Sequence, residues 1–212
     1  MRTARIVPLV VATALFMENT DSTVLATSLP AIATDIGASP IELKLAVTSY
    51  LLSLAVFIPA SGWTADRFGA RTVFCAAIAV FILGSIGCAF SASLTDFVIA
   101  RIVQGVAQAG LFPICTVTVA KWFPKTGRAF ATGALGSFMS VGGALCAWLT
   151  GVLLEVLQPH VGPGWNWRLT FLLYGVPGLL WAVWFWRWFR DEPREHPSVN
   201  AVELGLIEPE AA

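Results

Sequence analysis

The chain has 212 residues, of which 57% are apolar and only 12% are charged, against the ~25% charged residues of typical soluble domains. A domain of this size leaves much of its chain exposed, so water could not accommodate that much apolar surface. A soluble enzyme, a nucleic-acid-binding protein and a disordered chain are therefore excluded, and the balance of 13 basic and 13 acidic residues gives no net field that would attract a polyanion.

Six long apolar segments separated by short polar breaks predict an all-α membrane protein with six transmembrane helices. Six spans of about 20 residues use roughly 120 residues, and 57% of 212 is about 121. The predicted spans cover residues 6–29, 45–63, 73–90, 97–120, 130–157 and 169–189. These spans form a bundle over residues 1–189, and a polar tail over residues 190–212 follows it.

The basic residues predict that both termini are cytoplasmic, because Lys and Arg collect in cytoplasmic loops. With the N-terminus inside, ten of the 13 fall on the inner side, two fall on the outer side, and Arg101 lies within the fourth span. The ten are Arg2, Arg5, Arg67, Arg71, Lys121, Lys125, Arg128, Arg187, Arg190 and Arg194. This bias indicates a multi-pass protein of the cell (inner) membrane.

The first span carries two acidic residues, Glu18 and Asp21, which share a helix face because they are three positions apart. An ionisable group at mid-membrane costs about 2.5–3.5 kcal/mol on insertion scales, so both are candidate functional residues. Arg2 and Arg5 before an apolar run also resemble the start of a signal peptide, with residues 24–26 as a passable cleavage site.

Residues 62–71, between the second and third spans, read Gly-Trp-Thr-Ala-Asp-Arg-Phe-Gly-Ala-Arg. Gly62 permits close approach of helices, and Gly69 supplies a tight turn that favours a positive φ. Asp66 is placed to meet a helix N-terminus or an arginine, while Arg67 and Arg71 keep the loop on the inner side. From the residues alone, the alternative is a hairpin in which Asp66 only balances local charge.

This segment resembles the signature loop of the major facilitator superfamily, Gly-x-x-x-Asp-Arg-x-Gly-x-Arg, which lies between the same two spans in that family. The resemblance implies a secondary transporter rather than an enzyme, and the N-terminal six-helix half of the family fold, a 3+3 inverted repeat. It also implies that the loop acts as a conformational latch. The latch residues would be Gly62, Asp66, Arg67, Gly69 and Arg71.

The fourth span places Arg101, Gln104, Gly105 and Gln108 on one helical face. Residues 101–105 of this span are similar to the family motif Arg-x-x-Gln-Gly. The same face therefore combines an intramembrane charge with two amides and a glycine for helix packing.

Depth within the bilayer predicts that Asp21 and Arg101 meet. At ~1.5 Å per residue both lie about 8 Å from the outer edge of ~30 Å of hydrocarbon. We expect them to face each other across a cavity shared with Glu18, Gln104 and Gln108, where the carboxyl exchanges a proton during transport. The alternative is a fixed ion pair that only satisfies both charges.

Resemblances to two branches of the family favour different transport reactions. Residues 17–23 followed by Leu29-Pro30 resemble the first-helix motif of the fourteen-span drug:proton antiporters, and for that reason we expect the first helix to be uncleaved. Residues 110–113, 121–124 and 189–193 resemble the anion:cation symporters instead. In the fifth span, the antiporter motif keeps Gly142 and Gly143, which also permit close helix packing. The Gly-Pro positions of that motif are occupied by other residues.

The sequence therefore predicts proton-coupled uptake of a small organic anion or metabolite, with a drug:proton efflux antiporter half as the alternative. The expected partners are a small-molecule substrate, protons and the lipid bilayer, with a second six-helix half or a second copy of the chain. An alternative of another class is a truncated, non-transporting fragment or a structural membrane partner.

Cysteine and histidine positions give no reason to expect a cofactor or metal. All four cysteines fall in predicted spans without a Cys-x-x-Cys pair, and both histidines lie outside the spans. They are Cys75, Cys88, Cys115, Cys146, His160 and His196.

Overall fold

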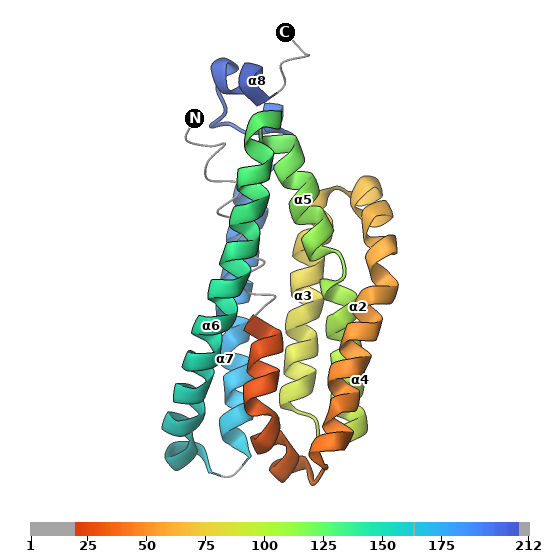
Figure 1. The fold of residues 1–212 in the computed structure, drawn as a ribbon, viewed down its shortest axis with the longest axis vertical. Helices are drawn as coiled ribbons and strands as arrows, with labels where there is room; N and C mark the ends of the chain where they lie inside the picture. Colours follow the sequence, from red (N-terminus) through yellow and green to blue (C-terminus); the bar gives the residue numbers. More distant parts are fainter. Residues whose placement is uncertain (1–19, 163, 208–212) are drawn as a thin grey trace.

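Long helices lying side by side make up the structure, a computed structural model described over residues 20–162 and 164–207 (Figure 1). A first helix is described over residues 20–36. The others are α2 (Pro40–Phe68), α3 (Ala70–Ala89), α4 (Leu94–Gln108), α5 (Leu111–Trp122), α6 (Arg128–Val161), α7 (Trp165–Trp188) and the short α8 (Ala201–Ile207). Within the described residues, five stretches are long and apolar enough to cross a membrane, with α4 and α5 together forming one of them. The predicted all-helical membrane fold is confirmed.

Several helices extend beyond the predicted apolar segments because polar residues cap them. In a capping box, Ser39 Oγ accepts from the Glu42 N–H at 3.2 Å and the Glu42 carboxylate accepts from the Ser39 N–H at 2.7 Å, so α2 begins at Pro40 rather than at residue 45. The first helix continues to residue 36, past the predicted end at residue 29. Most of the predicted first span, residues 6–19, lies outside the described residues.

The fourth predicted span contains a short break, although residues Leu94–Trp122 still form one candidate membrane span. α4 ends at Gln108, and α5 begins at Leu111 after a break at Ala109 and Gly110. Pro113 has no N–H to donate to the carbonyl of Ala109, and its ring would clash with that carbonyl in a regular helix. The break therefore follows from a proline four residues downstream.

Two apolar clusters fill the bundle, one toward each end. The cluster nearer the tail is built on Phe74, Leu135 and Trp122, and the cluster at the opposite end on Ile32, Phe97 and Trp167. Along α3 the first cluster takes Phe74 and Ile78, while the second takes Cys88 and Ala89. Polar side chains of α3 and α4 lie between the two clusters, where the candidate site is found.

An ion pair fixes the end of the first helix opposite the tail. Asp35 Oδ2 accepts from Arg168 Nη2 at 2.6 Å and from Trp167 Nε1 at 3.2 Å. Arg168 Nη1 also donates to the carbonyl oxygens of Ala89 and Ser91. One arginine at the start of α7 therefore holds the first helix and the end of α3 together.

The tail packs onto the bundle beyond α7, at the upper end in Figure 1. His196 is only 3% exposed and meets the rings of Trp122 and Trp188 edge to face, with centroid distances of 5.6 and 4.8 Å. Burial lowers the pKa of His196 below its ordinary value, and the positive charge of Arg190 acts in the same direction, while the Trp188 backbone opposes them. The docked tail therefore favours the neutral imidazole.

Docking of the tail should weaken as the pH falls below about 6.5, the ordinary pKa of histidine. A released tail takes up a proton on His196 in that range and a docked tail does not, so protonation favours release. Hydrogen exchange of the backbone amides of residues 190–207 measures this release. Dividing the exchange rate of wild type by that of His196→Phe at each pH cancels the intrinsic effect of pH on exchange. The ratio should rise on acidification; a constant ratio would contradict the role given to His196.

Candidate functional site: a buried ion pair between the first helix and α4

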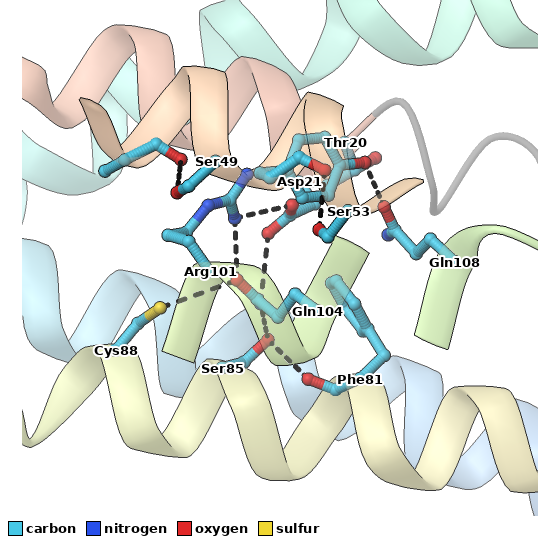
Figure 2. Close-up of polar contacts among 12 residues, drawn as sticks. Thr20, Asp21, Ser49, Ser53, Phe81, Ser85, Cys88, Arg101, Gln104 and Gln108 are labelled. Carbon is cyan, nitrogen blue, oxygen red and sulfur yellow. Dashed lines mark hydrogen bonds and ion pairs between the residues drawn. The ribbon is translucent and has the colours of Figure 1, made fainter. Parts of the chain in front are cut away.

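Asp21 of the first helix and Arg101 of α4 form an ion pair inside the bundle (Figure 2). Arg101 Nη1 donates to Asp21 Oδ2 at 2.7 Å, and the exposed fractions of the two side chains are 0% and 4%. The two residues are 80 positions apart in sequence, and the predicted contact between them is present. Breaking such a pair leaves an uncompensated buried charge, which typically costs about 3–5 kcal/mol.

Gln104 and Ser85 extend the pair toward α3. Gln104 lies one helical turn after Arg101, and its Oε1 accepts from the same Arg101 Nη1 at 2.7 Å. Gln104 Nε2 donates to Ser85 Oγ at 2.8 Å and lies 3.4 Å from Asp21 Oδ1. Because all four side chains are buried, their polar atoms depend on one another rather than on water.

Tyr50 of α2 completes the surroundings of the guanidinium. Arg101 Cζ lies 4.3 Å from the centroid of the Tyr50 ring, and the Tyr50 hydroxyl donates to Gln108 Oε1. A Cβ at Gly105 would overlap Ser53 Oγ and the Tyr50 carbonyl oxygen, so the glycine permits the close approach of α2 and α4.

Tyr50, Ser53 and Ser85 were not predicted as site residues from the sequence. The signal that could have found them is the one applied to charged residues: polar side chains inside apolar spans are costly and therefore informative. Tyr50 and Ser53 are three residues apart on α2, so their side chains lie on the same face of that helix.

A cavity of about 230 Å³ adjoins Asp21 on the side of α3, α6 and α7. Its described lining is Thr20, Asp21, Val24, Phe81, Ser85, Leu149, Phe171, Tyr174, Gly175 and Pro177. Among these residues Asp21 alone carries a charge, whereas Arg101, Gln104 and Gln108 are not part of the lining. The carboxylate reaches this cavity, and the guanidinium lies behind the carboxylate. Glu18 lies outside the described residues.

The predicted latch segment is helical rather than a loop. α2 continues through Asp66 and Arg67, both exposed, to Phe68, and Gly69 alone separates it from α3. Gly69 has φ +82°, the positive value expected from the sequence. A Cβ at Gly62 would meet nothing within 4 Å, so the expected close helix contact there is absent from the described part of the chain.

Arg71 and Asp191 join the start of α3 to the end of α7. The Arg71 N–H donates to Asp191 Oδ1 at 2.7 Å, and the Arg71 guanidinium donates to the Trp186 carbonyl while stacking 4.3 Å from the Trp186 ring. A carboxylate at a helix N-terminus is stabilised by the unpaired N–H groups there. Asp191 therefore holds the latch segment from within this half of the fold.

Of the other glycines predicted to pack helices, Gly142 is buried and Gly143 is half-buried on α6. The four cysteines form no disulfide bonds within the described residues. Among the residues that the structure describes, no three His, Cys, Asp or Glu side chains lie together so that they could hold a metal ion.

The site places one carboxylate between a buried guanidinium and an open cavity. Gln104 is a second acceptor for the same guanidinium nitrogen. The fold and this geometry define a polytopic membrane protein with an intramembrane ion pair.

Family and structural comparisons agree with this class. The Major Facilitator Superfamily model matches residues 11–209, so the chain belongs to that family of transporters and not to an enzyme family. The crystal structure of a bacterial homologue of the human lysosomal transporter Spinster, inward-facing and unoccupied, has a TM-score of 0.72 and 24% identity over 93% of this chain and 46% of that chain. The proton:xylose symporter XylE has a TM-score of 0.74 and 19% identity over 96% of this chain and 49% of that chain.

Two relatives with about 40% sequence identity are named as multidrug resistance proteins. The Salmonella dublin protein "Putative multidrug resistance protein MdtD" is 41% identical over 151 residues, which are 71% of this chain and 32% of that protein. The Salmonella typhi protein of the same name is 40% identical over the same length. The chain thus spans about a third of the curated relatives and about half of the solved structures.

Replacing Gly69 with alanine should destabilise the chain by about 2 kcal/mol, because its backbone conformation is one that only glycine adopts readily. A Cβ there would also lie 2.7 Å from Asp191 Oδ2. Gly62→Ala is the matched control in the same segment, since a Cβ there is unobstructed and alanine favours the helix. Thermal unfolding in detergent measures both; equal stability of the two variants would contradict this account of Gly69.

Proposed function

We propose that the chain is one half of a proton-coupled antiporter that exports apolar or cationic compounds, with Asp21 as the proton-carrying residue. The observation that carries the proposal is the buried Asp21–Arg101 pair, in which the carboxylate alone faces the adjoining cavity. A transporter of this kind alternates between a protonated and a deprotonated carboxyl. Asp21 has a permanent counter-charge on one side and an accessible volume on the other.

The cavity favours a cationic or uncharged substrate over an organic anion. An anion in this cavity would meet the Asp21 carboxylate and would not reach Arg101, whose side chain is fully buried behind it. Opposite charge attracts and like charge repels most strongly where water is excluded. The drug-resistance name of the relatives supports the same direction.

We further propose that a second six-helix half completes the transporter and that both termini of this chain face the cytoplasm. The partial coverage of the relatives supports the first point, together with the exposed apolar faces of α2 and α6, where Leu52 and Trp148 are 64% and 69% exposed. The asymmetric distribution of basic residues supports the second.

Asp21→Asn should abolish movement that is driven by a pH gradient, because an amide cannot exchange the proton. Liposomes containing the chain co-purified with a complementary six-helix half are loaded with the lipophilic cation ethidium or with benzoate, and the export of each is followed under an imposed gradient. We expect ethidium movement that falls at least tenfold in Asp21→Asn and persists in Asp21→Glu.

Asp35→Asn is the matched control, since it removes a carboxylate of the same helix that pairs with Arg168 away from the cavity. Gradient-driven benzoate movement, or ethidium movement unchanged in Asp21→Asn, would contradict the antiporter proposal. A chain that neither moves ethidium nor binds an Asp21-dependent proton would support the non-transporting alternative.

A further inference from the structure

Arg101 uses only one of its terminal nitrogens in the ion pair. Nη1 donates both to Asp21 and to Gln104, whereas Nε and Nη2 are buried with no hydrogen-bond partner among the residues described. Arginine and carboxylate groups usually pair through two parallel hydrogen bonds where the geometry allows, and such pairs are stronger. The neighbours of the guanidinium therefore matter for how it meets Asp21.

The Tyr50 ring is one such neighbour. It lies 4.3 Å from Arg101 Cζ, within the range of a cation–π interaction, and Tyr50 is only 4% exposed. Two features fix the ring: its hydroxyl donates to Gln108, and the Tyr50 backbone lies against Gly105. A buried ring held at both ends cannot give way when the guanidinium moves.

We propose that Tyr50 is a positioning residue for proton coupling, which holds Arg101 by the face of its guanidinium and so limits its pairing with Asp21 to a single nitrogen. Without the ring, Arg101 is free to form a two-point pair with the carboxylate, and that pair opposes protonation of Asp21 more strongly. The negative face of the ring also offsets part of the positive charge that Asp21 experiences. Both effects make the carboxyl easier to protonate when Tyr50 is present.

Other titratable groups in these surroundings do not supply the same effect. Among the residues that the structure describes, and apart from Asp21, those that face Arg101 are the Cys88 thiol of α3 and the Tyr50 phenol itself, and the cavity side adds Cys146 of α6 and Tyr174 of α7. Thiols and phenols are neutral at the pH values where a carboxyl titrates. The inference rests on the proposed function, because it assumes that Asp21 binds the coupling proton.

Infrared difference spectroscopy on the full chain in lipid nanodiscs tests the inference without requiring transport. The protonated-carboxyl band that disappears in Asp21→Asn reports Asp21, and its pH midpoint is measured in each Tyr50 variant. Tyr50→Phe keeps the ring but loses the bond to Gln108, so its midpoint should lie between those of wild type and Tyr50→Met. Tyr50→Met removes the ring and should lower the midpoint by about one pH unit, a tenfold change in proton affinity.

Fluorinated phenylalanines at position 50 separate the charge of the ring from its shape, and they serve if Tyr50→Met does not fold. Replacement of Tyr50 by phenylalanine carrying one and then three ring fluorines weakens the negative face stepwise at nearly constant volume, so the midpoint should fall stepwise. Phe57→Met, which removes an exposed ring elsewhere on α2, is the matched control and should change nothing.

Two failures are distinguishable. If Asp21 titrates and the fluorinated series has the same midpoint as Tyr50→Phe, the role of Tyr50 is overturned while the proposed function stands. If wild type shows no Asp21-dependent band, the proposed function and the inference that rests on it are both overturned.

Discussion

The burial of two opposite charges within a bundle of apolar helices is the constraint on which the rest of the site depends. Taking an aspartate and an arginine out of water costs several kcal/mol for each ion, and their attraction, with hydrogen bonds from neighbouring side chains, offsets part of that cost. Gln104 and Ser85 supply hydrogen bonds from two helices, and Tyr50 supplies an aromatic face from a third. The pair therefore specifies how the first helix, α2, α3 and α4 must be placed relative to one another.

Close helix contacts make this arrangement possible. Gly105 brings α2 against α4, and the apolar clusters above and below the polar layer exclude water from it. Ties at the two ends complete the frame: Arg168 joins the first helix to α3 and α7 at one end, and Asp191 joins α3 to the tail at the other. A site held in this way keeps its geometry while the carboxyl gains and loses a proton.

The sequence allowed the meeting of Asp21 and Arg101 to be predicted, because the constant rise of a helix fixes the depth of each residue in a bilayer. Depth does not determine how a helix is rotated against neighbours that are distant in sequence. For that reason Tyr50 was missed and Arg101 was expected in the cavity wall. The break at Gly110 and the helical latch segment depend on local backbone geometry, which the apolar pattern does not report. Motifs shared by several branches of the family pointed toward the symporters, whereas overall similarity points toward drug-resistance proteins.

Asp21 as an exchangeable proton site is the central claim, and counting protons tests it most directly. The purified chain in detergent is titrated between about pH 8 and pH 4, and its proton uptake is compared with that of Asp21→Asn at equal concentration. The account predicts that wild type binds one more proton per chain than Asp21→Asn. It predicts the same difference between Asp35→Asn and the double variant Asp21→Asn/Asp35→Asn. Equal uptake by wild type and Asp21→Asn would show that the Asp21–Arg101 pair is a fixed structural ion pair and would contradict the account.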